Sequence, residues 1–451
     1  MYPPKYQENI QEDLFKVRLD SFINIKHELV RLAQHINWQE LDEHFSAFYA
    51  RTGRPGNPTR LMIGLHILKH VYKLSDEEVC AWWAHSPYFQ YFCGETFFQH
   101  RFPHERSSMT HWRNRVGDKS LEKILQESLI VALKTDALKP HDLQKIVVDT
   151  TVQEKAITYP TTAKLHYKAI ERLNAAIAQE NETVTLRQSF IRVAKQAVIK
   201  VQRYRHAKQM KRAKKMMRKL NTYLGRLIRD IERKVVNKSQ FLKDALSKAS
   251  RIFHQKPQDK EKLLSWHAPE VECISKGKPH KPYEFGCKVS VITTLNRSKA
   301  GHFVLQADAL HNNPYDGHTL KQALENYTNM TGIQPRRVFV DKGYRGHDKS
   351  LKPFTFHSGM RKLSSLIKRE LRRRPVIEPL IGHLKNDGLM KRNYLKGFVG
   401  DKINALFSAI GHNFRLLLTW CRDFFAQLSC VLFTFLKSAY LSFENYLLFG
   451  F

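Results

Sequence analysis

The chain has 451 residues, with 75 Lys and Arg against 42 Asp and Glu, so its formal net charge is +33. This length supports two or three domains with hydrophobic cores. The charge indicates a polyanionic partner, with nucleic acid favoured over an anionic membrane surface. The six cysteines show no Cys-x-x-Cys spacing, which argues against a zinc ribbon or a disulfide framework. Because no signal peptide opens the chain, we expect it in the cytoplasm.

Residues 1–140 have the pattern of several short helices. Apolar residues recur at helical spacing, and Ser75 precedes three acids as a helix cap would. The stretch Ser107–Val116 combines basic and aromatic side chains. Helices joined by tight turns are typical of a helix-turn-helix-like DNA-binding unit, in which Arg113 and Arg115 would contact DNA. A plain helical dimerisation domain explains the pattern almost as well.

A basic insertion follows the first predicted strand, Leu143–Thr151. From Thr183 to Arg229 there is no acidic residue, while apolar residues keep a helical spacing. This pattern predicts an amphipathic helical hairpin with one cationic face. The alternative is a merely solvated face, but the absence of acids favours contact with phosphate. The strongest candidates are Lys208, Lys211, Arg212, Lys214 and Lys215.

The second half of the chain alternates strands and helices. We predict strands at Tyr283–Thr294, His302–Ala309, Val338–Val340 and Pro353–His357, and helices at Leu320–Met330, Leu363–Arg374 and Ala405–Trp420. With the first strand, this order predicts a mixed sheet flanked by helices. The Phe-rich end is no clean membrane span, because charged residues leave too short an apolar run.

Three acids stand out in this part of the chain. Asp341 follows the apolar run Val338–Val340, and Asp149 follows a similar run, so each lies where a buried strand is expected to stop. Asp341 taken alone would be read as a turn cap. Glu378 follows a basic stretch, and Pro375 and Pro379 around it predict that a new helix starts there.

Three carboxylates converging in a basic groove repel one another unless cations neutralise them. Two Mg²⁺ ions would remove this cost and would clamp the attacking and leaving oxygens of a phosphodiester. Asp308 and Asp316 compete with Asp341 for the second position. Lys385 lies two turns after Glu378 on the same helical face, within reach of a DNA phosphate, and Arg374 would approach from the preceding segment.

Several motifs resemble the DDE transposases encoded by bacterial insertion sequences, most closely the IS-five family. The pattern Arg374-x-x-x-Glu378-x-x-x-x-x-x-Lys385 resembles the signature around that family's last catalytic acid. The blocks 148–153 and 340–344 resemble those around the first and second acids, and 267–273, 280–286 and 313–318 also resemble this branch. The resemblance runs from about residue 40 to 420. Leu371 departs from it, because family members often carry tyrosine there.

The resemblance implies a ribonuclease H-like catalytic domain, formed by residues 141–160 and 256–420. A basic helical insertion at 161–255 interrupts it, the all-α domain 1–140 precedes it, and a Phe/Leu-rich tail, 421–451, follows. The implied activity is that of a Mg²⁺-dependent transposase, with Mn²⁺ as a substitute ion. Asp149, Asp341 and Glu378 would hold two ions, and Arg374 and Lys385 would contact DNA.

The implied reaction cuts the inverted-repeat ends of the element and joins their 3′-hydroxyl groups to target DNA. The chain would act as a homo-oligomer on DNA in the nucleoid, without a membrane. Two alternatives stay open. One is a DNA-binding protein without catalytic activity, and the other is a ribonuclease H-fold nuclease that cuts without joining strands.

Overall fold

The computed structural model describes residues 17–50, 52, 55–180, 186–256, 258–279 and 281–422, so the predicted tail lies outside the described residues. Its contacts divide the chain into two compact units. The core unit contains Met1–Gln153, Lys288–Leu395 and Val399–Phe451, and the bundle unit contains Glu154–Cys287 and Lys396–Phe398. The N-terminal helices therefore share a unit with the sheet, whereas we expected them to form a separate domain.

In the described part of residues 17–144 the secondary structure consists of helices joined by loops, with one isolated bridge between Arg18 and Phe97. The Ser75 side chain and Glu78 form the expected capping box at the start of α5. The α-helices are α1 (Leu19–Phe22), α2 (Glu28–His35), α3 (Trp38–Ser46), α4 (Thr59–Tyr72), α5 (Asp76–His85), α6 (Pro87–Phe92), α7 (Ser107–Val116) and α8 (Glu122–Lys134), with short 3-10 helices η1 (Lys119–Leu121) and η2 (Pro140–Gln144).

Helix α4 joins these helices to the rest of the core unit. It is buried along most of its length. Its His66 and His70 stack on Phe407, which lies in a helical run over residues 397–422. Gly411 of the same run leaves room for α4, because an added Cβ would lie 2.8 Å from the His70 carbonyl oxygen. This close packing explains why the N-terminal helices are not a separate unit.

The sheet of the core unit has the strand order β4-β3-β1-β5-β6. Strands β1 and β5 pair in parallel, as do β5 and β6, whereas β3 and β4 are antiparallel, so the predicted mixed sheet is confirmed. Strand β1 is longer than expected, and Asp149 lies inside it rather than at its end. The strands are β1 (Lys145–Glu154), β3 (Lys281–Thr294), β4 (Val304–Leu310), β5 (Arg337–Val340) and β6 (Thr355–His357).

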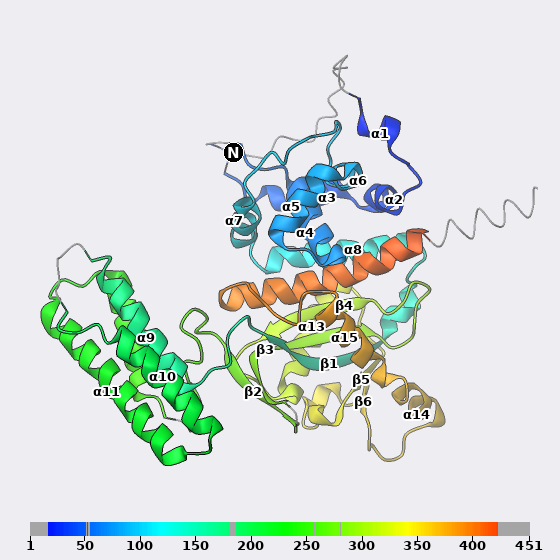
Figure 1. Cartoon of the computed structure of the whole chain (residues 1–451). Coiled ribbons are helices and arrows are strands. Elements are labelled where there is room, and N and C mark those ends of the chain that lie inside the picture. Colours follow the sequence, from blue (N-terminus) through cyan, green and yellow to red (C-terminus); the bar gives the residue numbers. More distant parts are fainter. Residues whose placement is uncertain are drawn as a thin grey trace, which may run out of the picture. The chain divides into compact units, whose positions relative to one another are not determined.

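Helices flank this sheet (Figure 1). A small apolar cluster of Val147, Leu295, Phe339 and Ile377 anchors the start of α15 against β1 and β5. The predicted break before Glu378 is present, because α14 ends before the 3-10 turn that contains Pro375. The elements are α13 (Asp316–Thr331), η3 (Lys342–Tyr344), η4 (Lys349–Leu351), α14 (Ser365–Leu371), η5 (Arg374–Val376) and α15 (Ile377–Asn386).

Among its described residues, the bundle unit has four helices with their own apolar core, and Figure 1 shows them packed together. They are α9 (Thr162–Ile177), α10 (Ile191–His206), α11 (Met210–Lys234) and α12 (Gln240–His254), and α10 and α11 form the predicted hairpin. A strand that we did not predict, β2 (Glu272–Lys278), pairs antiparallel with the first part of β3. Among the described helices, none combines the length and the apolar character needed to cross a membrane.

The two ends of the bundle unit are tied together where the chain enters and leaves it. The Lys155 amide donates to the Phe285 carbonyl oxygen at 2.9 Å. The Lys155 side chain pairs with Glu270 at 2.8 Å, and both side chains are only 4% exposed. A buried, closely paired charge of this kind fixes local geometry, because separating the partners would leave an uncompensated charge.

Candidate active site

Asp149 lies in β1, and Asp341 directly follows the adjacent parallel strand β5. Val147 pairs with Phe339, so continuing the register by two residues brings Asp149 opposite Asp341. Asp341 directly follows β5, and one of its oxygens accepts the Gly343 amide at 2.6 Å. Asp341 is therefore a turn cap as well as a neighbour of Asp149. The strands expected to carry the two aspartates, β1 and β5, are adjacent, although Asp341 lies just beyond the end of β5.

Arg374 connects the first and third predicted acids. Its Nη2 lies 2.6 Å from Asp149 Oδ2, with side-chain exposures of 18% and 17%. Its Nη1 lies 3.8 Å from Glu378 Oε1, and the Glu378 side chain is 67% exposed. The short contact to Asp149 is the stronger one, because it is shielded from solvent and charge-assisted. Glu378 is thus connected to Asp149 through a long, solvent-exposed contact with the Arg374 guanidinium.

Asp316 is the fourth carboxylate of the site. Its Oδ1 accepts hydrogen bonds from Thr150 Oγ1 and from Lys288 Nζ, each at 3.0 Å. A Cβ built on Gly343 would lie 2.8 Å from Asp341 Oδ1 and 3.4 Å from Asp316 Oδ2, so both carboxylates approach this glycine. The sequence left Asp316 as a rival to Asp341, whereas the structure brings both together.

Asp308, the other rival, lies elsewhere in the core unit. It sits in β4, where burial raises the pKa of its carboxyl and the charge of Lys402 lowers it. The neighbouring acid that raises the pKa of Asp308 further is Asp118, in the helical N-terminal part of the core unit. We therefore leave Asp308 out of the candidate site.

Tyr344 is a component of the site that the sequence reasoning missed. Its side chain is fully buried, and its hydroxyl has no hydrogen-bond partner among the described residues. Burial raises its pKa well above the usual value, and the negative charges of Asp149, Asp316 and Asp341 raise it further. The phenol therefore stays protonated and lies within the field of all three aspartates. A tyrosine directly after Asp-Lys-Gly was the available signal.

The carboxylates do not form a metal site in this arrangement. Within the described part of the chain, no three His, Cys, Asp or Glu side chains are placed to hold an ion. Carboxylate oxygens are the ligands that Mg²⁺ prefers, so the donor type is suitable. The positions of the carboxylates do not fit a bound ion, because the Arg374 guanidinium is paired with the Asp149 carboxylate and the Glu378 side chain faces solvent. Lys385 is partly buried in the same helix, seven residues after Glu378.

Helix α7 presents one polar face and buries the other. Arg113 lies on the buried face and is only 4% exposed. Its guanidinium donates to Asp76 at 2.6 and 3.1 Å and to Thr110 at 3.0 Å. This corrects the expectation that Arg113 contacts DNA, since the side chain would have to break a shielded ion pair to do so. Its spacing from Met109, Trp112 and Val116 was the signal for burial.

Arg115 has the exposure that Arg113 lacks. Its guanidinium lies over the Tyr49 ring, 5.1 Å from the ring centre. The exposed residues of α7 are all polar or basic, a composition suited to hydrogen bonding along a groove of DNA. They are Ser107, Thr110, His111, Asn114 and Arg115.

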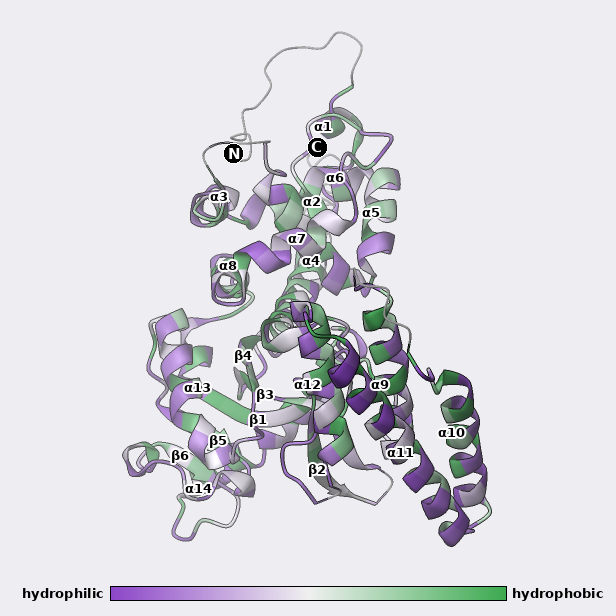
Figure 2. Cartoon of the chain, turned by 90° about the vertical axis from the view of Figure 1, so that its left-hand side faces the viewer, coloured by the Kyte–Doolittle hydropathy of each residue, from purple (hydrophilic) through white to green (hydrophobic). Residues whose placement is uncertain are grey.

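A second candidate surface lies in the bundle unit. We call five exposed side chains around the α10–α11 turn the cationic patch, and they are Lys208, Lys211, Arg212, Lys214 and Lys215. Figure 2 colours long stretches of α10 and α11 as hydrophilic. Within the described residues none of the five forms an ion pair, and Arg212 bonds only the neutral Gln209 side chain, at 3.0 Å.

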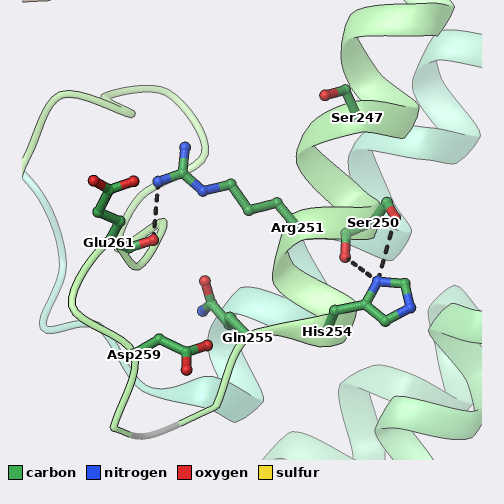
Figure 3. A pocket seen from close by; sticks show the side chains of 7 residues that line it. All are labelled: Ser247, Ser250, Arg251, His254, Gln255, Asp259 and Glu261. Atoms are coloured by element: carbon green, nitrogen blue, oxygen red, sulfur yellow. Dashed lines mark hydrogen bonds between the residues drawn. The ribbon is translucent and has the colours of Figure 1, made fainter.

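Two hollows in the surface add little to these sites. One, of about 420 Å³ in the bundle unit, has a mixed lining in which Arg251 donates to the Glu261 carbonyl oxygen (Figure 3). Its lining combines acids and bases without a common sign of charge, so it defines no ligand class. The other, of about 460 Å³ in the core unit, is lined by Leu295, Asn296, Arg297, His302, Arg373 and Val376.

Comparison with known proteins identifies the family to which this chain is related. Residues 17–115 match the family described as a transposase domain (DUF772). The protein described as uncharacterised protein ORF8 in the nfe locus of Rhizobium meliloti is 48% identical over 206 residues, which are 46% of this chain and 99% of that relative. No solved structure matches the chain. The chain therefore belongs to the same family as the Rhizobium meliloti protein, and its N-terminal part carries a transposase domain.

Proposed function

We propose that the protein is a DDE transposase that cleaves the inverted-repeat ends of an insertion sequence and joins the 3′-hydroxyl ends to target DNA. One observation carries this proposal. Asp149 lies in β1, Asp341 directly follows the adjacent parallel strand β5, Arg374 of η5 pairs with Asp149, and Glu378 lies in the first turn of α15, in a chain that carries a transposase domain. Paired carboxylates at a strand edge suit phosphodiester chemistry.

The sheet supports a ribonuclease H-like catalytic core. That pattern predicts that the strands carrying the first two acids are adjacent and central, and β1 and β5 meet this condition. A helix that brings the third acid towards the same edge also agrees with it, and α15 starts with Glu378 in its first turn. The ribonuclease H-like assignment remains part of the proposal.

Arg374 gives the site a way to receive a phosphate. A guanidinium binds carboxylate and phosphate in the same planar geometry, so DNA phosphate can compete with Asp149 for it. Asp341 is held by the Gly343 amide and keeps its position during such an exchange. Lys385, on the same face of α15, would add a second cationic contact to the backbone of the bound end.

Mg²⁺, with Mn²⁺ as a substitute, remains the predicted cofactor. When bound, the ions would neutralise the carboxylates and polarise the scissile phosphate. In the arrangement described, Arg374 supplies the positive charge beside Asp149. Binding of an ion at Asp149 therefore requires that this arginine first moves away.

DNA is the proposed partner of two surfaces. The exposed face of α7, including Arg115, has groove-reading composition, and the cationic patch suits contact with phosphates without base recognition. The protein would act as a homo-oligomer on DNA. Because Arg113 is buried, recognition by α7 rests on its other polar residues.

The deciding experiment incubates the full chain with labelled inverted-repeat ends, a target plasmid and Mg²⁺ or Mn²⁺, and scores joined product. Cleavage and joining that disappear together in Asp341→Asn support the proposal. Cleavage without joining supports the nuclease alternative. Binding without cleavage in either ion supports a DNA-binding protein and contradicts the proposal.

A further inference from the structure

The segment 313–318 is built against the loop that carries Asp341. The Tyr315 hydroxyl donates to the Arg345 carbonyl oxygen at 2.7 Å. An added Cβ on Gly317 would lie 3.2 Å from each of the Tyr344 and Arg345 carbonyl oxygens. Glycine suits this position, because a Cβ here would be in tighter contact with the two carbonyl oxygens than is usual and would lie 2.9 Å from the Tyr315 ring.

Asp316 contacts both halves of the candidate site from this segment. Through Oδ1 it accepts the Thr150 hydroxyl, which directly follows Asp149 in β1. Its Oδ2 faces Gly343, two residues beyond Asp341. Asp316 is thus bonded to the strand that contains the first acid and lies close to the loop that contains the second.

Lys288 holds Asp316 in this position. Its ammonium group donates to Asp316 Oδ1 at 3.0 Å and to the Pro314 carbonyl oxygen at 2.7 Å. The two side chains are 11% and 25% exposed, so the pair is shielded from solvent. A shielded pair with two further hydrogen bonds has one strongly favoured geometry, because any rearrangement leaves a charge without a partner.

The buried Tyr344 hydroxyl is a hydrogen-bond donor close to the same candidate site. The Tyr344 hydroxyl lacks a partner among the described residues and lies in the field of Asp149, Asp316 and Asp341. Buried hydroxyls without partners are uncommon in native proteins and call for a functional explanation. A protonated hydroxyl in the field of three carboxylates is suited to donate to an oxygen that enters the site.

We propose that Asp316, held by Lys288, is a positioning residue that sets the distance between Asp149 and Asp341. It does so by clamping the loop 341–346 to β1, and it touches no substrate itself. Its effect on the reaction rests on the proposed transposase function, but the clamp can be measured without any DNA.

The first measurement is amide hydrogen exchange of the full-length chain over residues 341–347, in wild type and in Asp316→Asn. Loss of the charge weakens the bonds to Lys288 and Thr150, so we expect exchange in this loop to rise by roughly tenfold or more. Asp308→Asn is the matched control, because it removes a carboxylate of the core unit outside the site. Unchanged exchange in Asp316→Asn, or an equal rise in Asp308→Asn, overturns the clamp.

The second measurement separates binding from turnover with an inverted-repeat duplex. We expect Asp316→Asn to keep the affinity for DNA within about twofold while the single-turnover cleavage rate falls by roughly tenfold to a hundredfold. Asp316→Glu, which keeps the charge, should recover part of the rate. A cleavage rate equal to wild type, with the loop exchanging faster, overturns the positioning role.

The double variant Lys288→Met with Asp316→Asn tests whether Asp316 merely neutralises Lys288. If it does, removing both charges restores cleavage and loop protection, and the proposal is wrong. If cleavage stays low in the folded double variant, the role of Asp316 is to position Asp149 and Asp341. Should Asp316→Asn fail to fold, Tyr315→Phe removes one loop contact alone, and unchanged exchange there overturns the clamp. A wild-type chain that cleaves nothing refutes the proposed function, while loop exchange still decides the clamp.

Discussion

In the core unit the cations beside the aspartates are held by carboxylates, whereas in the bundle unit the cationic patch has no acidic partner among the described residues. Arg374 pairs with Asp149 and Lys288 pairs with Asp316, and all four side chains are at most one-quarter exposed. The five patch residues are exposed, and Arg212 donates to the neutral side chain of Gln209.

The difference separates two uses of positive charge. A shielded cation bound to a carboxylate sets geometry, and its partner's charge cancels most of its long-range field. An exposed cation without an acid keeps its field and attracts a polyanion from a distance. Arg113 shows that residue type alone does not decide between these uses, since it lies in a basic stretch yet belongs to the first class.

The largest expected effect is the loss of cleavage and joining when one of the three predicted catalytic acids is replaced. Asp341→Asn, Asp149→Asn and Glu378→Gln should each reduce cleavage and joining by roughly a thousandfold or more, because a missing carboxylate removes several kcal/mol of transition-state stabilisation. DNA affinity should stay near wild type. The measurement is single-turnover cleavage with a parallel binding titration. Retained cleavage in Asp341→Asn would mean that another acid takes the second position.

The next effect concerns the cationic patch. Replacing Lys208, Lys211, Arg212, Lys214 and Lys215 by Gln should weaken binding to specific and random duplex alike. Each phosphate contact adds about 0.9 to the slope of log affinity against log salt, so the slope should fall by up to about 4.5. Activity should partly recover at low ionic strength, because the acids remain intact.

A charge-matched control tests whether position matters in that experiment. Five other basic residues of the bundle unit offer the same loss of charge, and they are Arg172, Lys243, Lys248, Lys256 and Lys260. Their replacement by Gln should change the salt slope much less. Equal slopes in the two variants would show a general charge effect, and an unchanged slope in the patch variant would mean that the patch only solubilises the bundle.

A smaller effect is expected at Arg374. Arg374→Met removes the guanidinium that pairs with the Asp149 carboxylate at 17% exposure, which should cost about 1–3 kcal/mol of folding stability. The same change removes a competitor for Asp149, so binding of Mn²⁺ to the DNA-free chain should tighten. Urea unfolding and Mn²⁺ titration measure the two effects. Arg372→Met, an exposed neighbour, is the control and should change neither.

The smallest effect comes from a third class of basic group, which the fold keeps uncharged. Burial lowers the pKa of His412 from 6.5 to about 4, and the charge of Arg415 adds to this. Between these values the unfolded chain binds a proton that the folded chain does not, so stability falls as pH drops below about 6.5. At pH 5 the loss should be on the order of 1–2 kcal/mol.

His412→Gln tests this assignment, because Gln keeps a hydrogen-bond donor but does not titrate. Its urea midpoint should depend less on pH between 7 and 5 than that of wild type. His66 behaves similarly, since burial lowers its pKa to about 3, so some dependence should remain. His85→Gln at an exposed position is the control. An equal pH dependence in His412→Gln and wild type would contradict the assignment.

Sequence patterns predicted the parts of the fold that depend on local signals. The apolar run before Asp341 predicted β5, and the flanking prolines predicted the break before α15. The helix Ser107–Val116 was predicted at its observed bounds. These features depend on residues within a few positions of one another, so one stretch of chain contains the information.

The parts that were missed depend on distant partners. The buried Arg113 pairs with Asp76, which lies 37 positions away in the sequence. Asp316 accepts a hydrogen bond from Thr150, which lies 166 positions away. Strand β2 exists because β3 pairs with it, and its own sequence, with Lys276 and Lys278, lacks an apolar alternation. The union of the N-terminal helices with the sheet likewise depends on His66 and His70 stacking against Phe407.

The hydrogen bond between Lys155 and Phe285 also bears on how such a protein changes over evolutionary time. The residues at which the chain enters and leaves the bundle are hydrogen-bonded to each other, so the chain between them is an insertion with adjacent ends, here called the cassette. A longer or shorter cassette costs little, because the entropy of closing a loop grows only slowly with its length. Related chains can therefore gain, lose or exchange the helical bundle while β1 and β3 keep their pairing, and the surface proposed to contact DNA can diverge faster than the acids.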